Sequence, residues 1–160
     1  MKPKWTKSQR FERAETLTLD GTPRDVFPQL CPVLEYEWLP GWKCRMLYSA
    51  SGVAEKNAIF HTVEMGIRKS VWTVLTYEPD RLIEYLIVGG RDAVVRLSLS
   101  LESRGDKTLL HWRMLFTLTS ALGRALVGRA FSEAGFQKMM RARTAELNHY
   151  LGTKRMRGRD

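Results

Sequence analysis

The chain has 160 residues, of which 44% are hydrophobic and 10% aromatic, so it is long and apolar enough to bury the core of one domain, which excludes a disordered chain. Its apolar runs fall short of the roughly 18 residues that cross a bilayer, and its N-terminus lacks the apolar core of a secretory signal, which predicts a cytoplasmic protein without a transmembrane segment. The formal net charge of +9 would suit a nucleic-acid or anionic membrane partner only if the charge lay on the folded domain.

The basic charge is concentrated in two predicted tails, residues 1–10 and 152–160. Together they hold eight Lys or Arg residues and one acidic residue. The 18 bases and 16 acids that remain give residues 11–151 a net charge of +2. We therefore expect a single, nearly neutral domain at 11–151 and no specific nucleic-acid partner.

The N-terminal part of the domain predicts one strand followed by two short helices. Phe11–Leu19 ends in β-forming residues and stops at an Asp-Gly turn signal, so it is the first strand. A helix begins after Thr22, where a capping threonine precedes a proline, and Pro28 keeps this helix short or kinks it. A second short helix is predicted within Cys31–Trp38, before a Pro-Gly pair ends it.

From residue 43 onward the hydrophobic period changes to two, which is typical of half-buried strands. Short turn signals rich in Gly, Pro, Asp and Ser separate the segments. The six predicted strands are Lys43–Ser49, Ala58–Met65, Ser70–Glu78, Arg81–Val88, Ala93–Leu101 and Lys107–Thr119. Short turns favour a sequential antiparallel sheet over parallel strands joined by helices.

Alternation along these strands also assigns their faces. In Ala58–Met65 we place His61 on the inner face with Ile59 and Val63, and Phe60 and Thr62 on the outer face. The last two strands alternate most clearly, and their inner faces contain Leu97, Leu99, Trp112 and Met114. His111 is expected on the outer face.

Residues 120–151 predict one long C-terminal helix with an unusual stripe of small residues. At intervals of four and three, these residues share one helix face: Ala121, Ala125, Gly128, Ser132 and Gly135. Glycine costs helix stability, so either the helix packs very closely on the sheet or the stripe leaves room for a ligand. A helix break at Gly128 is a third reading.

This order of elements resembles the helix-grip fold of the START-like (SRPBCC) superfamily, which includes polyketide cyclase/dehydrase and lipid-transport proteins. The resemblance covers about residues 11–151, and the segments CPVLEYEWLPGWKCRMLYS and SGVAEKNAIF resemble a bacterial branch that implies no particular reaction. It implies an α+β fold in which a curved seven-stranded antiparallel sheet wraps around the long C-terminal helix. It also implies binding of a hydrophobic or amphipathic small molecule, whether aromatic, polyketide-like or acyl, between that helix and the sheet.

The predicted ligand site combines the inner sheet face, the helical segment near the mouth and the small-residue stripe. Its thirteen residues are Tyr36, Trp38, Trp42, Met46, Tyr48, His61, Leu97, Leu99, Trp112, Met114, Gly128, Ser132 and Gly135. Tyr48, His61 and Trp112 stand out, because each brings a polar group that needs a partner once buried. For any single aliphatic member, plain core packing is the competing interpretation.

Three functional hypotheses follow. The first is a small-molecule binding protein; the second is a cyclase or dehydratase-type enzyme with His61 as its acid-base residue, to which Glu35 and Glu37 contribute only if the chain bends them inward. The third is an interaction module that works through its basic tails.

The three histidines and two cysteines lack the spacing of metal ligands, so no metal and no cofactor are expected. Cys31 and Cys44 are expected to be reduced thiols. The sequence carries no signal of oligomeric state.

Overall fold

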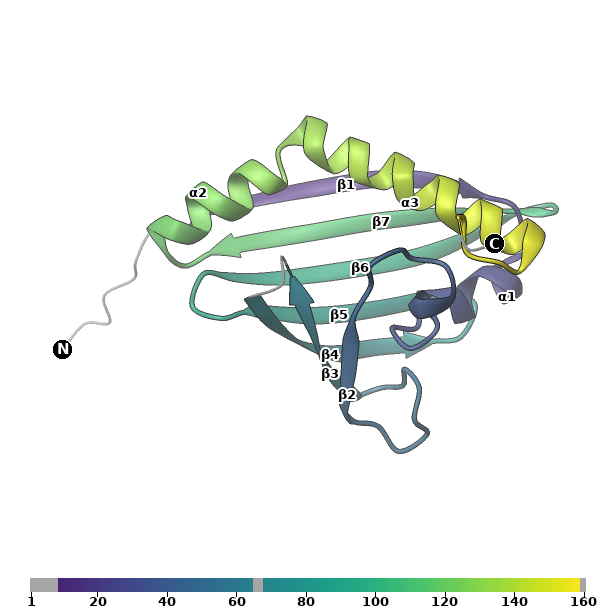
Figure 1. Ribbon diagram of the computed structural model, residues 1–160, viewed down its shortest axis with the longest axis horizontal. Coiled ribbons are helices and arrows are strands. Elements are labelled where there is room, and N and C mark those ends of the chain that lie inside the picture. The colour runs from purple at the N-terminus through teal and green to yellow at the C-terminus, as the bar shows by residue number, and fades with distance from the viewer. Residues whose placement is uncertain (1–8, 65–67, 159–160) are drawn as a thin grey trace.

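The computed structural model describes residues 9–64 and 68–158 and confirms the predicted α+β architecture. Within this part of the chain there are seven strands (Figure 1). They are β1 (Gln9–Leu19), β2 (Cys44–Tyr48), β3 (Ile59–Glu64), β4 (Arg68–Glu78), β5 (Leu82–Gly89), β6 (Ala93–Arg104) and β7 (Lys107–Leu118).

The strands form one antiparallel sheet in the order β1-β7-β6-β5-β4-β3-β2. Strands β2 to β7 follow one another as a meander, as their short turns predict. The first strand pairs with the last along its whole length, from Gln9 opposite Leu118 to Leu19 opposite Thr108. This pairing brings the start of β1 beside the segment that leads into the C-terminal helices.

The short helices after β1 lie where they were predicted. They are α1 (Pro23–Val26), the 3₁₀ turn η1 (Phe27–Leu30) and the 3₁₀ turn η2 (Glu35–Glu37). The Asp25 carboxylate accepts hydrogen bonds from the Thr22 backbone N–H at 2.9 Å and from its hydroxyl at 2.6 Å, which satisfies the helix N-terminus. The chain tightens into η1 around Pro28, so the first helix is short, as expected.

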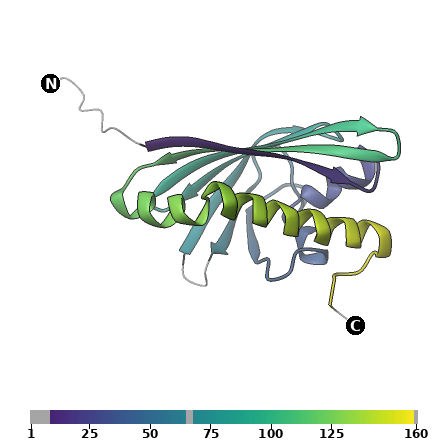
Figure 2. The same ribbon diagram turned by 90° about the horizontal axis from the view of Figure 1, so that it is seen from above.

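The predicted long C-terminal helix is two helices, α2 (Ala121–Ala130) and α3 (Glu133–Thr153). They lie along one face of the sheet, and α3 packs mainly on β1 (Figure 2). The break is at Phe131 and Ser132, not at Gly128. There the Phe131 ring packs against Phe116 at 4.7 Å between centroids, and its carbonyl accepts a hydrogen bond from Arg13 Nε at 2.9 Å.

One end of the molecule, which we call the filled end, is a packed core under α1 and the C-terminal half of α3. Leu147 and Leu151 are buried there, together with Leu17, Leu19 and Val26. Asn148 ties the helix to β1, since its side chain accepts from the Asp20 N–H at 2.8 Å and donates to the Thr18 carbonyl at 3.1 Å.

The opposite end, which we call the hollow end, is covered by α2 and the first half of α3. Here α2 touches the sheet at the β5–β6 turn, where a side chain on Gly123 would place its Cβ 2.2 Å from the Asp92 carbonyl oxygen. Ser120 caps this helix by accepting from the Gly123 N–H at 2.9 Å. This contact and cap therefore fix the N-terminal end of α2 on the sheet.

Strands β6 and β7 have the predicted faces. Leu97, Leu99, Trp112 and Met114 are buried on the inner face. His111 lies on the outer face, where its Nδ1 is 3.1 Å from the Thr16 hydroxyl. The clean alternation of these two strands was therefore sufficient to assign their faces.

The faces of β3 were predicted the wrong way round. Phe60 and Thr62 are buried on the inner face, whereas His61 lies outside, opposite Arg45 on β2 and Val71 on β4. Both faces of this strand carry apolar residues, so its pattern alone was ambiguous, and the aromatic packing of Phe60 decides it. The indole N–H of Trp72 donates to the Thr62 hydroxyl at 3.0 Å, which allows a buried threonine.

Tyr48 also lies outside, with 60% of its surface exposed. A β-bulge between Met46 and Tyr48 shifts the register, so Met46 opposes the inward Phe60 and Tyr48 opposes the outward Ile59. The alternation that we extended through Tyr48 ends at this bulge.

The prediction that the small-residue stripe forms a buried helix face is wrong. Ala121, Ala125 and Ser132 are exposed, and a side chain on Gly128 would meet nothing within 4 Å. Ser132 is the N-cap of α3, where its hydroxyl accepts from the Gly135 N–H at 3.3 Å. The stripe assumed one continuous helix, and the break at Phe131 and Ser132 rotates its two halves apart.

The predicted tails are only partly visible. Residues 1–8 and 159–160 lie outside the described residues, Arg10 is already part of β1, and α3 continues to Thr153. In the described part of the chain, no helix combines the length and apolarity needed to cross a membrane. Both cysteines are free thiols, as predicted; Cys31 is buried and Cys44 half-buried.

Candidate functional site

A cavity of about 550 Å³ lies at the hollow end, between the sheet and the two C-terminal helices. The sheet contributes Leu97, Trp112 and Met114, and the helices contribute Val127 and Met139. The remaining sides come from the segment before β2 and from β3 and β4. Apolar side chains dominate this lining, as is usual for small-molecule pockets.

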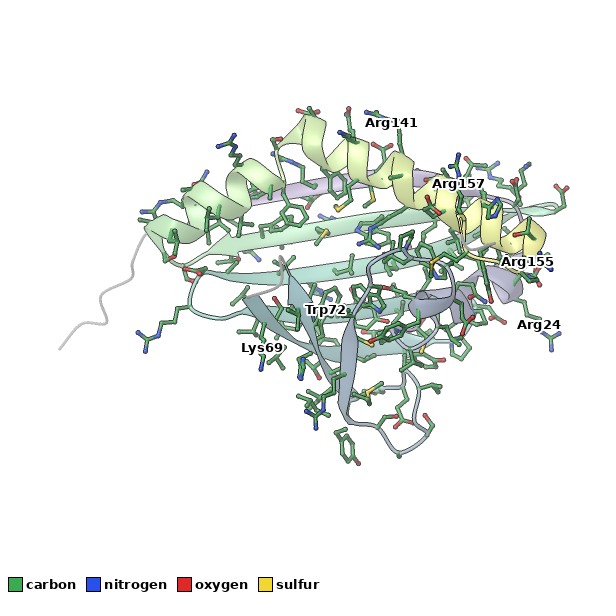
Figure 3. The ribbon with its side chains drawn as sticks, viewed as in Figure 1. Arg24, Lys69, Trp72, Arg141, Arg155 and Arg157 are labelled. Carbon is green, nitrogen blue, oxygen red and sulfur yellow. The ribbon has the colours of Figure 1, made fainter. Side chains whose placement is uncertain are left out.

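Aromatic residues form the side of the cavity nearest β4. Trp72 is central, with ring centroids 5.3 Å from Phe60, 5.6 Å from Tyr85 and 6.2 Å from Trp42. Figure 3 shows Trp72 among the side chains that fill the space below the helices. Rings locked in stacked and edge-on contacts give this side a fixed shape before any ligand arrives.

The rim of the cavity carries charge. Lys43 and Lys69 are exposed there, and Asp92 lies at the β5–β6 turn. Two lysines against one aspartate leave a net positive rim, which favours the approach of anionic molecules.

A small recess of about 20 Å³ adjoins the cavity and shares Trp42, Trp72, Leu97, Trp112 and Arg143 with it. Glu35 also borders this recess and is only 9% exposed. Its volume is sufficient for about one water molecule. The deep end of an apolar cavity is therefore polar.

The pKa values of the two ionisable groups at this deep end are shifted by burial. Burial raises the pKa of Glu35 to about 8, and the nearby Arg143 only partly opposes that rise. Burial likewise lowers the pKa of Arg143 below the usual value for arginine, with Glu35 opposing the shift. The Arg143 guanidinium lies 5.2 Å from the Trp112 ring centroid, in a cation–π contact. At neutral pH the Glu35 carboxyl is thus mostly protonated beside a cationic arginine.

Residues 10–152 match the family described as polyketide cyclase / dehydrase and lipid transport. The chain belongs to this family. The START-like (SRPBCC) resemblance is thereby confirmed, and the family and fold support a ligand-binding or cyclase-type role. Among curated proteins, none matches the chain significantly.

Solved structures share the helix-grip fold of this chain. Truncated norcoclaurine synthase from Thalictrum flavum has a TM-score of 0.67 at 11% identity, with 95% of this chain and 99% of that chain covered. The Mll3558 protein from Rhizobium loti has a TM-score of 0.61 at 17% identity, with 89% and 100% covered. At these identities the likeness concerns the fold alone.

In the present chain, four of the predicted site residues border the cavity: Trp42, Leu97, Trp112 and Met114. Leu99 borders the recess. The structure therefore brings together the residues of β6 and β7 and one tryptophan of the segment before β2.

Eight predicted residues lie elsewhere. Trp38 is fully buried and donates its indole N–H to the Gln29 carbonyl at 2.9 Å, and Tyr36 is 41% exposed with its hydroxyl bonded to the Cys44 backbone. Met46 packs against the core beside the cavity. The other five were displaced by the β3 inversion, the β2 bulge and the helix break: Tyr48, His61, Gly128, Ser132 and Gly135.

Most of the other lining residues were not predicted as site residues, and three of them matter for the chemistry: Arg143, Trp72 and Glu35, the last named only on condition that the chain bends it inward. It does, because η2 buries Glu35 beside the recess that Trp42 and Arg143 of α3 also border. Arg143 had a readable signal, since it falls in the apolar stripe of α3, between Met140 and Leu147. A charge on a buried helix stripe marks a functional candidate.

Proposed function

We propose that the protein binds a hydrophobic or amphipathic small molecule, aromatic, polyketide-like or acyl in character, in the cavity between α2–α3 and the sheet. The observation that carries this proposal is a cavity of about 550 Å³ lined mainly by apolar and aromatic side chains. Drug-sized ligands occupy pockets of roughly 300–1,000 Å³. Norcoclaurine synthase from Thalictrum flavum has been solved in complex with dopamine and hydroxybenzaldehyde, which supports an aromatic ligand for this fold.

Binding of the neutral dye Nile red tests the proposal. Val127 borders the cavity, so Val127→Phe fills part of it and should weaken dye binding about ten-fold or more. Leu126→Phe is the matched control, because Leu126 is 42% exposed on the same helix and should leave binding unchanged. Equal dye binding by both variants would place the dye outside the cavity and contradict the proposal.

Native mass spectrometry of the protein purified from its own host identifies the molecule. A bound species that is lost after denaturation and organic extraction gives the chemical class of the ligand. The Val127→Phe variant should carry less of it than Leu126→Phe does.

A second candidate function is a cyclase or dehydratase-type reaction with Glu35 as the acid-base residue. It is favoured by a carboxyl group at the cavity whose pKa of about 8 lies near neutral pH, where general acid-base catalysis is most effective. His61 cannot have this part, since it lies on the outer face. Incubating the extracted molecule with fresh protein should then yield a cyclised or dehydrated product, and Glu35→Gln should abolish turnover while binding persists. Equal turnover by that variant would exclude Glu35 as the acid-base residue.

A further inference from the structure

Three enclosed polar atoms meet at the deep end of the cavity without hydrogen-bond partners among residues 9–64 and 68–158. They are Glu35 Oε2, Trp112 Nε1 and Arg143 Nε, from η2, β7 and α3. All three residues border the same recess of about 20 Å³. Buried polar groups are nearly always hydrogen-bonded, so three unsatisfied ones in a single recess call for an explanation.

The surrounding polar groups show that this is not a general feature of the core. Trp42 Nε1 donates to the Pro32 carbonyl at 2.8 Å, Trp72 Nε1 to the Thr62 hydroxyl at 3.0 Å, and the Tyr85 hydroxyl to the Leu30 carbonyl at 2.9 Å. In the described part of the chain, three other enclosed side-chain atoms lack partners, and none of their residues borders the cavity or the recess: Gln29 Oε1, His61 Nδ1 and Glu146 Oε2.

The recess is a donor-rich, cationic environment at neutral pH. Arg143 and Trp112 each present an N–H, and the largely protonated Glu35 presents an O–H. The other titratable groups that interact with Glu35 are Tyr85 and Cys44, and burial raises the pKa of both, so they stay neutral. Arg143 therefore supplies the one unbalanced charge of this group of residues.

We propose that this recess and the adjoining end of the cavity anchor a carboxylate at one end of an otherwise apolar ligand, with Arg143, Trp112 and Glu35 as its hydrogen-bond partners. The inference rests on the proposed binding function and specifies its ligand class. A carboxylate offers two oxygens and a negative charge to this set of donors, whereas a hydroxyl satisfies fewer of them and an ammonium is repelled. Lys43 and Lys69 at the rim favour the same sign of ligand.

Displacement of Nile red by decanoate, 1-decanol and decylamine, at equal chain length and pH 7, measures this selectivity. Decanoate should displace the dye at concentrations about 10- to 100-fold lower than decanol does, the range expected of a charge-assisted hydrogen bond, and decylamine should be weakest. Arg143→Met should abolish the preference for decanoate. Arg141→Met is the matched control, because Arg141 points away from the sheet on the same helix and its loss should change nothing (Figure 3).

Two further arms keep the test decisive if Arg143→Met does not fold. Trp112→Phe keeps an aromatic ring beside the guanidinium but removes the N–H and part of the ring volume, so it should weaken decanoate several-fold more than it weakens decanol. Decanoate affinity should also fall as the pH rises from 7 to 9, because ionised Glu35 repels the carboxylate. Glu35→Gln should remove this pH dependence.

The outcomes separate the two proposals. Equal displacement by decanoate and decanol, an equal effect of Trp112→Phe on both compounds and no pH dependence would overturn the carboxylate site and leave the apolar cavity function standing. Failure of Nile red and of all three compounds to bind would overturn both.

Discussion

The filled end and the hollow end are covered by the same helix layer, yet the first is closely packed and the second contains a cavity. At the filled end, Leu147 and Leu151 of α3 pack onto β1 and α1, and Asn148 bonds to the β1 backbone. At the hollow end, Met139 and Arg143 of the same helix face a cavity of about 550 Å³. The first end contributes the packing that stabilises the fold, and the second end keeps space and unsatisfied polar atoms that do not.

Because the two ends differ in packing, we expect stability and binding to be separable along α3. Substitutions at the filled end should lower stability and leave binding intact. Substitutions at the hollow end should do the reverse.

Leu147→Ala should have the largest effect. It should lower the free energy of unfolding by about 2–5 kcal/mol, because it leaves a cavity in a closely packed region. Met139→Ala, on the same helix but beside existing empty space, should cost distinctly less. Urea denaturation measures both, and Nile red affinity should be unchanged in folded Leu147→Ala. Equal costs at the two positions would contradict this difference in packing.

The pH dependence of stability should depend on Glu35. Its folded pKa of about 8 lies above its ordinary value of 4.5, so the native state binds more protons than the unfolded state between these values. The free energy of unfolding should therefore fall as the pH rises from about 4.5 to about 8, by a few kcal/mol, since one pKa unit is worth about 1.4 kcal/mol. Glu35→Gln should remove this slope in denaturation curves measured at each pH. An unchanged slope would mean that Glu35 is not the titrating group.

Gly123→Ala should destabilise the protein by about 1–3 kcal/mol, because its Cβ would lie 2.2 Å from the Asp92 carbonyl oxygen and push α2 off the β5–β6 turn. The matched control is Gly128→Ala in the same helix, where the new Cβ meets nothing within 4 Å. That change should stabilise by up to about 1 kcal/mol, the usual helix preference for alanine. Thermal unfolding distinguishes the two, and a shared sign would refute the close contact at Gly123.

Ser132→Ala should have the smallest effect, a loss of about 0.5–1 kcal/mol from the N-cap of α3. Since Ser132 is exposed outside the cavity, Nile red binding should stay as it was. A marked loss of dye binding without a loss of stability would restore a binding role to this residue.

Much of the fold could be predicted because its elements are local patterns. The alternation of Ala93–Leu101 and Lys107–Thr119 assigned their faces, and the order Thr22, Pro23 located α1. The errors in the site arose where one residue shifts a register. The β2 bulge moved Tyr48 outside, and the helix break at Phe131 and Ser132 dispersed the small-residue stripe. Beyond a bulge or a helix break, periodicity no longer predicts which face a side chain lies on, because the register of the following residues has shifted.

Local sequence patterns were enough to predict the strand order along the chain, the short helices after β1 and the apolar inner faces of β6 and β7. Four residues of the predicted ligand site, Trp42, Leu97, Trp112 and Met114, line the cavity. By contrast, Glu35 and Arg143 are 108 positions apart and meet Trp112 at the deep end of a cavity only because the chain folds. Their pKa values and their missing partners depend on burial by three separate elements. Desolvation is a property of the assembled fold, so no local pattern encodes it.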